Sequence, residues 1–375
     1  MTRPLRILQV MRAPVGGLFR HVADLTRMLN ARGHSVGLIV DALASDAQTT
    51  ARLEALRDHA TLGIHAMPMP RVLGKGDLTA PFAVRRIAQR VSADILHGHG
   101  AKGGLYARLA HLGRKLPAAV YTPHGGVLHF SARSRSGQVF HWLERKLLNQ
   151  TGAIVFESQF ARDTYSRLIA PPSCRTEIIY NGLDRAEFEP VAKVGDPADF
   201  VFVGELRELK GIFPLVDALK QLKRTDGRPV TLVMAGDGPQ REELEAHIAG
   251  LSLQRQVKLV GSQPARSVFA MGNYGVIPSL AESLPYVVLE ATAAGLPVVT
   301  TRVGGIPEIF AGTTETLVEP GNAEALAVSM QRMLDEPEAA MAELAIRRRR
   351  VETEFSLDTM ATRIEALYRD ILDKA

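Results

Sequence analysis

The feature that most constrains the fold is a repeated alternation of short apolar runs with longer helical stretches. In the first half, strands are expected at residues 5–10, 35–40, 63–67, 94–97, 118–122, 153–156 and 177–180. After a linker at 190–197 the alternation restarts, with strands expected at 199–203, 230–235, 257–260 and 274–277. Strands that alternate with helices form parallel sheets covered on both faces. The sequence therefore predicts an α/β fold, with ligands at the carboxyl ends of the strands.

Length and charge suggest two bodies with different partners. The chain has 375 residues, enough for two domains that each bury a core. Residues 1–185 carry 25 Lys and Arg against 12 Asp and Glu, whereas residues 186–375 carry 20 against 28. A basic first half would suit an anionic acceptor or an anionic membrane surface, with ordinary scatter of surface charge as the alternative. The single cysteine excludes an internal disulfide framework.

Residues 278–307 contain two carboxylates, Glu282 and Glu290, in an apolar, glycine-rich context. A helix is expected here, with Pro285 in its first turn, where a missing N–H costs nothing. Eight residues of helix would separate the two carboxylates by about 12 Å. Helix N-termini bind anions, and carboxylates accept hydrogen bonds from paired hydroxyls. The stretch thus predicts a site for a nucleotide-diphosphate sugar; two solvent-facing helix carboxylates are the alternative.

The same stretch resembles the E-x7-E signature of retaining GT-B glycosyltransferases of family 4, with Glu282 and Glu290 at the two glutamate positions. The resemblance implies a GT-B fold, with two Rossmann-like, doubly wound parallel-sheet domains facing across a cleft. It implies an acceptor-binding domain at 1–188, a donor-binding domain at 189–355, and a C-terminal helix at 356–375 that packs back on the first domain. Leu284-Pro285 departs from the family's usual Phe-Gly pair, so the shape of the sugar pocket does not follow from the resemblance.

Residues 204–211 resemble the family's G-R-L-x-x-x-K-G segment, in which an arginine and a lysine hold the donor diphosphate. Gly204 and Lys210 match this segment, whereas Glu205 stands at the arginine position. Arg207 lies two residues further on and would share a face with residue 205 if the backbone is extended. Our hypothesis is that Arg207 replaces the missing arginine.

Two glycine turns also match the family. Gly236, Gly238 and Pro239 match its G-x-G-P turn, which lies near the nucleotide. Gly16 and Gly17 match a Gly-Gly loop that faces the cleft, and a plain tight turn is the alternative.

Histidines follow two of the expected strands in the first half. His124 resembles the histidine of the family's T-x-H-G segment, which contacts the transferred sugar or the acceptor; a core histidine with satisfied hydrogen bonds is the alternative. His97 and His99 would share one face of an extended segment. A zinc site would need a third ligand at suitable spacing, which the sequence does not show, so we expect a polar loop.

The resemblance also assigns roles to the remaining residues. Glu290 would hold the ribose hydroxyls, and Glu282 with Ser283 and Leu284 would hold the sugar hydroxyls. No metal and no cofactor is expected, because cations and helix N-termini would stabilise the leaving group. The residues expected to act in catalysis are His124, Lys210, Arg207 and Glu282.

The function implied is retaining transfer of a sugar from a UDP- or GDP-sugar to a glycan or polyprenyl-linked acceptor, in bacterial surface polysaccharide biosynthesis. Two other functions remain open: a soluble small-sugar synthase of the same fold, and a non-catalytic nucleotide-sugar-binding protein. The basic segment 130–148 would hold a cytoplasmic enzyme on the inner face of the membrane, although a core-packed helix with a basic flank explains it equally well. Nucleic acid is not expected as a partner, because no binding motif accompanies the charge.

Overall fold

A computed structural model describes residues 3–42, 47–70, 74, 76–111, 118–125 and 134–374. The chain divides into two compact units, Met1–Gly182 with Leu357–Ala375, and Leu183–Ser356. The first unit therefore ends before the boundary at residue 188 that the sequence suggested. Residues 126–133, which include the start of the basic segment 130–148, lie outside the described residues.

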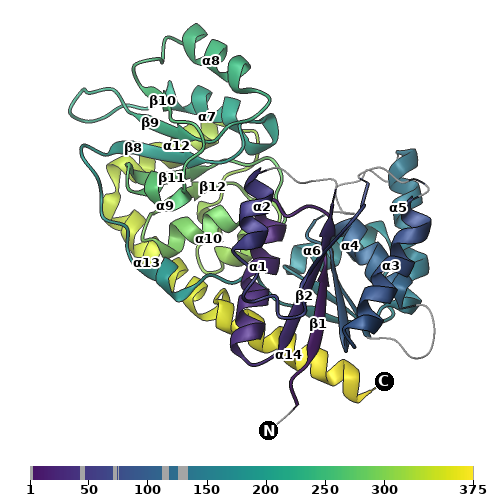
Figure 1. Cartoon of the computed structure of the whole chain (residues 1–375). Coiled ribbons are helices and arrows are strands. Elements are labelled where there is room, and N and C mark those ends of the chain that lie inside the picture. Colours follow the sequence, from purple (N-terminus) through teal and green to yellow (C-terminus); the bar gives the residue numbers. More distant parts are fainter. Residues whose placement is uncertain are drawn as a thin grey trace. The chain divides into compact units, whose positions relative to one another are not determined.

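The first unit contains a parallel sheet with strand order β3-β2-β1-β4-β5-β6-β7 among its described residues (Figure 1). Its strands are β1 (Arg6–Val10), β2 (Ser35–Asp41), β3 (Ile64–Met67), β4 (Ile95–His99), β5 (Ala118–Thr122), β6 (Ala153–Phe156) and β7 (Arg175–Ile178). Its helices are α1 (Gly16–Ala31), α2 (Ala47–Glu54), α3 (Gly76–Arg90), α4 (Gly100–Ala110), α5 (Arg135–Leu147), α6 (Gln159–Leu168) and α14 (Leu357–Asp373), with a 3-10 turn η2 (Leu148–Gln150).

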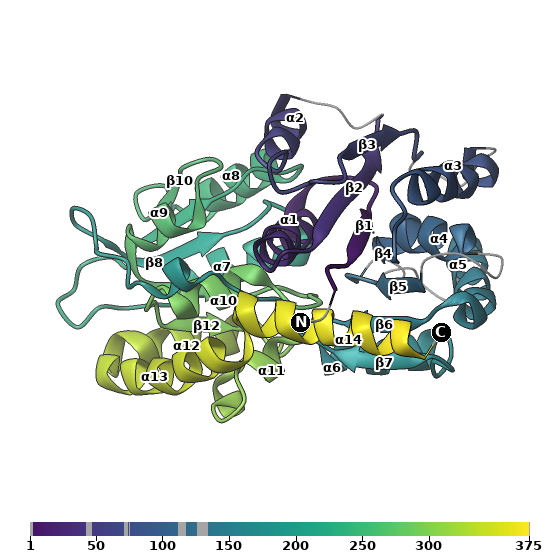
Figure 2. The same ribbon diagram turned by 60° about the horizontal axis from the view of Figure 1, so that its bottom comes forward.

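Helices cover both faces of this sheet because successive strand residues point to opposite sides. On one face, Leu25 of α1 and Ile364 of α14 belong to the same core as Ile7 of β1. On the other face, Leu105 of α4 packs in a core with Leu8 of β1. Figure 2 shows α14, the last helix of the chain, lying along this sheet beside α1.

The second unit contains a smaller parallel sheet with strand order β10-β9-β8-β11-β12. Its strands are β8 (Ala198–Val203), β9 (Leu232–Ala235), β10 (Val257–Leu259), β11 (Gly272–Ile277) and β12 (Val298–Thr300). Its helices are α7 (Ile212–Leu219), α8 (Arg241–Gly250), α9 (Ala265–Phe269), α10 (Tyr286–Ala293), α11 (Ile306–Ile309), α12 (Ala323–Asp335) and α13 (Pro337–Glu354), with 3-10 turns η3 (Arg185–Phe188), η4 (Glu208–Lys210) and η5 (Thr314–Thr316).

Each sheet reverses its strand order at one point, and these points predict where ligands bind. In the first sheet the order runs outward in both directions from β1 and β4, and in the second from β8 and β11. Loops that leave neighbouring strands at such a switch point diverge to opposite faces and leave a crevice at the carboxyl ends. The expected alternation of strands and helices is confirmed. The two switch points, between β1 and β4 and between β8 and β11, are where ligands are expected.

A buried ion pair joins α4 to α5 in the first unit. The guanidinium of Arg108 donates two hydrogen bonds, of 2.8 and 2.6 Å, to the carboxylate of Glu144. The Tyr165 hydroxyl donates a third, of 3.0 Å, to the same carboxylate. The Arg108 guanidinium also lies 4.0 Å from the centre of the Tyr121 ring. Arg108 is fully buried, so removing its partner would leave an uncompensated charge in the core.

We therefore expect Glu144→Ala to lower the free energy of unfolding by about 3–5 kcal/mol, measured by urea denaturation. The double variant Arg108→Met, Glu144→Leu should recover most of this loss, since no charge then remains buried. Arg57→Ala, which breaks the exposed Arg57–Glu54 pair, serves as the control and should leave the unfolding curve unchanged. Equal curves for Glu144→Ala and the control would contradict the expectation.

Candidate functional site

At the switch point of the second sheet, the loops after β8 and β11 bring Lys210 and Glu282 together. The Lys210 ammonium lies 2.5 Å from Oε1 of Glu282. The hydroxyl of Ser279 donates a 2.7 Å hydrogen bond to the same carboxylate oxygen. Both side chains remain partly accessible, at 20% and 11% exposure. Two sequence motifs separated by more than seventy residues thus form one charged site.

Glycines set this contact because two backbones approach too closely for a side chain. Gly211 has φ +70, and a Cβ there would lie 1.9 Å from the carbonyl oxygen of Pro278. Gly304 has φ +57, and a Cβ there would lie 2.1 Å from the carbonyl oxygen of Glu282. The next residue, Gly305, donates its N–H to the carbonyl of Ser283 at 2.6 Å. The Glu282 loop is thereby clamped between the segments that follow β8 and β12.

The predicted G-x-G-P turn packs on the loop that carries Lys210. A Cβ on Gly236 would lie 1.8 Å from the carbonyl oxygen of Gly204, and one on Gly238 would lie 2.5 Å from that of Leu206. Leu206 donates its N–H to Asp237 at 3.0 Å. Pro239 follows immediately, two residues before α8 begins. The two predicted donor segments therefore lie against each other.

Arg207 lies in the same loop but is paired with the residue it was expected to replace. Its Nε lies 3.1 Å from Oε2 of Glu205, and its side chain is 42% exposed. Its backbone is extended, with φ −144 and ψ 154, and its carbonyl accepts the N–H of Lys210 at 2.9 Å. Glu205 thus forms an ion pair with Arg207, the residue that our hypothesis assigns to binding the diphosphate.

The structure corrects one expectation about the two glutamates. Only Glu290 lies on α10, which begins at Tyr286 with Pro285 as its N-cap residue. Glu282 precedes the helix, and Ser283 and the buried Leu284 lie in the loop between them. The helical rise therefore does not determine the separation of the two carboxylates. The cause is the hydrogen bonding of Glu282 to Ser279 and Lys210, which holds it with the loop after β11.

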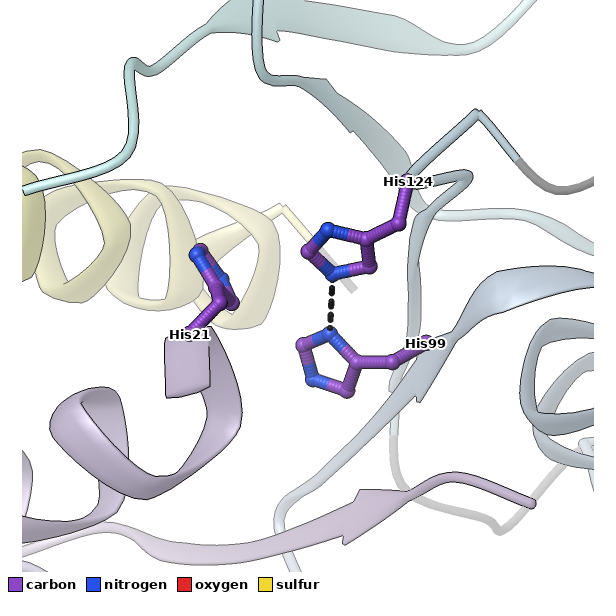
Figure 3. A group of neighbouring side chains, drawn as sticks. All are labelled: His21, His99 and His124. Atoms are coloured by element: carbon purple, nitrogen blue, oxygen red, sulfur yellow. Dashed lines mark hydrogen bonds between the residues drawn. The ribbon is translucent and has the colours of Figure 1, made fainter. Parts of the chain in front are cut away.

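At the switch point of the first sheet, three histidines converge from three elements. His21 lies on α1, His99 ends β4, and His124 follows β5 (Figure 3). His99 Nδ1 and His124 Nε2 are 3.0 Å apart. His97 lies on the same face of β4 as His99, but its ring nitrogens instead bond the Tyr368 hydroxyl at 2.6 Å and the Thr122 hydroxyl at 2.8 Å.

His21 was not among the expected site residues, although a signal was present in the sequence. His21 lies between Leu18 and Leu25 at helical spacing, on the buried stripe of α1, where a polar ring is unusual unless it has a polar partner. The glycines Gly16 and Gly17 begin the same helix, and Gly16 has φ +63. His124 is a non-glycine residue with φ +50, a strained backbone conformation of the kind that concentrates at functional sites.

Burial keeps these imidazoles neutral. It lowers the pKa of His21 to about 4 and lowers the pKa values of His97, His99 and His124 well below their usual range. At neutral pH these rings therefore offer lone pairs and N–H groups rather than positive charge.

The part of the chain described here contains no helix with the length and apolar character needed to cross a membrane.

Comparison with known proteins agrees with this architecture. Residues 184–349 match the family described as glycosyl transferases group 1, and residues 15–187 match glycosyltransferase family 4. A glycogen synthase of Mycobacterium tuberculosis is 27% identical over 94% of this chain and 91% of its own.

An Escherichia coli UDP-Gal:alpha-D-GlcNAc-diphosphoundecaprenol alpha-1,3-galactosyltransferase is 24% identical over 61% of this chain and 63% of its own. Among solved structures, Anabaena Alr3699/HepE in complex with UDP-glucose has a TM-score of 0.77 at 20% identity, covering 99% of this chain and 100% of that one. The two sheets thus form a GT-B fold, and the matches together span almost the whole chain. The chain is a glycosyltransferase. It belongs to the family 4-like group 1 glycosyltransferases, whose two family models match its first and second parts.

Proposed function

We propose that this enzyme transfers a sugar from a UDP- or GDP-sugar to a glycan or lipid-linked acceptor with retention of anomeric configuration. The setting proposed is bacterial surface polysaccharide biosynthesis at the inner face of the cytoplasmic membrane. The observation that carries the donor half of this proposal is the Lys210–Glu282 contact at the switch point of the second sheet.

The two side chains suit the two ends of a phosphate–sugar linkage. An ammonium carries three donors, and Glu282 occupies one of them, so the others are available to diphosphate oxygens. Glu282 accepts hydrogen bonds and is oriented by Ser279, so it can receive sugar hydroxyls. In this proposal Ser283 and Leu284 supply backbone groups to the sugar, and Glu290 binds the ribose. The UDP-glucose complex of the Anabaena protein supports a donor of this class.

The proposed chemistry needs no residue to form a bond with the sugar. The bond between C1 and the phosphate oxygen breaks, and the acceptor oxygen bonds C1 on the same face. The acceptor proton passes to the departing diphosphate, whose added negative charge Lys210 offsets. A double displacement would instead leave the sugar covalently bound to a carboxylate, and trapping such an adduct would contradict front-face transfer.

In this proposal the donor step uses no metal ion and no cofactor. Lys210, Arg207 and helix N-termini supply the positive potential that stabilises the departing diphosphate. His124 and the Gly16-Gly17 turn keep the roles that the family resemblance implies, His124 toward the transferred sugar or acceptor and the glycines toward the donor.

The donor assignment predicts the behaviour of two variants in EDTA-treated enzyme. Lys210→Ala should lower kcat by about 10²–10³-fold, because it removes transition-state charge stabilisation. Glu290→Ala should lower kcat/KM on the order of 10–100-fold, because it removes charged hydrogen bonds to the ribose. Release of UDP, GDP or ADP from matching sugar donors, with the product anomer assigned by NMR, measures both effects and names the donor.

Lys220→Ala, at the far end of α7 from Lys210, is the matched control and should retain wild-type turnover. An inverted anomer would reject retention. If the wild-type protein bound no nucleotide sugar, the donor site itself would be rejected.

The ion pair between Glu205 and Arg207 gives a separate prediction. If Arg207 serves the diphosphate, Arg207→Ala should lower kcat by at least about tenfold, because a charged hydrogen bond is lost. Glu205→Gln should lower the KM for the donor, since it releases Arg207 from its partner. Unchanged kcat and KM in Arg207→Ala would mean that Lys210 acts without it.

Exposed apolar side chains on the first unit support a membrane-bound acceptor. Phe82 of α3 is 68% exposed and Trp142 of α5 is 53% exposed, with Leu78 and Val139 exposed beside them in sequence. Both helices pack against α4. Arg145 and Lys146 end α5 and add basic charge. An apolar surface with basic residues is typical of proteins that bind anionic lipid headgroups.

Trp142 is the only tryptophan in the chain and therefore reports on this surface. We expect its fluorescence to shift to the blue when anionic vesicles are added at low salt, and the shift to reverse at high salt. Phe82→Ser should weaken vesicle co-sedimentation, whereas Val328→Ser, which changes an exposed valine of the second unit, should not. Full transferase activity on a soluble sugar acceptor without vesicle binding would favour the small-sugar synthase.

A further inference from the structure

The histidine group in the first unit has the geometry of a metal site. His21, His99 and His124 each offer one ring nitrogen, and these nitrogens all lie within 4.8 Å of one another. Figure 3 shows the three rings approaching from separate elements, α1, the end of β4 and the loop after β5. Tetrahedral zinc with bonds of about 2.0–2.1 Å requires ligand nitrogens about 3.3 Å apart. His99 Nδ1 and His124 Nε2, which are 3.0 Å apart, already lie near this distance.

Hydrogen bonds to two side-chain amides orient the rings. His21 Nδ1 lies 3.0 Å from Oδ1 of Asn181, which can only accept, so the His21 proton is on Nδ1. His99 Nε2 lies 2.6 Å from Oε1 of Gln9, so the His99 proton is on Nε2. The opposite nitrogens, His21 Nε2 and His99 Nδ1, therefore carry lone pairs. Fixing a ring through its second nitrogen is how proteins orient metal-ligating histidines.

One of these lone pairs has no partner. His21 is 1% exposed, and its Nε2 is a buried polar atom without a hydrogen bond among the described residues. An unsatisfied buried acceptor costs about 1–3 kcal/mol, so a ligand at this nitrogen would stabilise the fold. His124 has a strained backbone with φ +50, and its Nε2 lies 3.0 Å from His99 Nδ1.

We propose that His21 Nε2, His99 Nδ1 and His124 Nε2 bind a zinc-type divalent ion, with a fourth position open to a water or a ligand oxygen. Asn181 and Gln9 orient two of the ligands from behind. Because His99 Nδ1 carries a lone pair, His124 Nε2–H donates the 3.0 Å hydrogen bond between them. Binding the ion breaks this bond and moves the His124 proton to Nδ1, so three neutral imidazoles bind the ion with no net change in protonation. His97 is not a ligand, because both of its nitrogens are engaged by Tyr368 and Thr122.

Such an ion would tie α1, β4 and the loop after β5 together at the switch point of the first sheet. Three histidines with an open fourth position resemble the ligand sets of catalytic rather than structural zinc sites. The donor step proposed for the second unit does not depend on the ion.

The test uses full-length protein without a histidine tag, stripped with EDTA and then freed of the chelator. Zn²⁺ is titrated against a chromophoric chelator, and Co²⁺ binding is followed by visible absorption. We expect one equivalent of Zn²⁺ per chain and the Co²⁺ spectrum of a four-coordinate site. His21→Ala and His99→Ala should each lower the affinity more than 100-fold, and Asn181→Ala should lower it about 10–100-fold. His59→Ala, outside the group, is the control and should bind as the wild type does.

Wild-type protein that binds less than one equivalent, or variants His21→Ala and His99→Ala that bind as tightly as the His59→Ala control, would overturn the proposal. Circular dichroism establishes that each variant is folded. If a ligand variant does not fold, the wild-type Co²⁺ spectrum decides alone, and a spectrum of hydrated six-coordinate Co²⁺ overturns the proposal. Each of these readouts is independent of transferase activity, so failure of the zinc site leaves the proposed function standing.

Discussion

The Lys210–Glu282 site depends on backbone-to-backbone contact between loops at the carboxyl ends of the second sheet. Gly211 lies against Pro278, Gly236 against Gly204, and Gly304 against Glu282, each so closely that a methyl group would overlap a carbonyl oxygen. These contacts bring the loops after β8, β9, β11 and β12 into one layer. A side chain at any of the three glycines would separate two loops, and the Lys210–Glu282 contact depends on their approach.

The polar side chains at the two switch points differ in charge and in exposure. In the second unit, a lysine and a glutamate remain partly accessible and satisfy each other as a charged pair that a ligand can enter. In the first unit, four imidazoles are held neutral by burial and are linked by hydrogen bonds among themselves and to amide and hydroxyl groups. A charged site suits a diphosphate, whereas neutral lone pairs suit a cation or a hydroxyl.

Motifs predicted the turns of the second unit because these turns rest on local backbone geometry. The glycines at 204, 236 and 238 were expected to form turns near a nucleotide, and they do form a packed pair of turns. The helix carrying Glu290 was also expected, but Ser279 and Lys210 hold Glu282 in the loop before it, so the helical rise does not separate the two carboxylates. The histidine group was not anticipated: His97 and His99 were expected in a polar loop but are buried in β4, and His21 lies 78 residues from His99 in the sequence.

The sequence by itself determined the alternation of strands and helices, the group 1 glycosyltransferase family and the positions of the glycine turns in the second unit. These follow from periodicity and from glycine and proline positions, which act within a few residues of chain. Only the tertiary structure decided which distant residues meet: Lys210 with Glu282, Arg207 with its own neighbour Glu205, and His21 with His99 and His124. The physical reason is that parallel strands bring segments that are distant in sequence to the same edge of a sheet. The order of the strands determines which of these segments come into contact, and no local sequence pattern specifies that order.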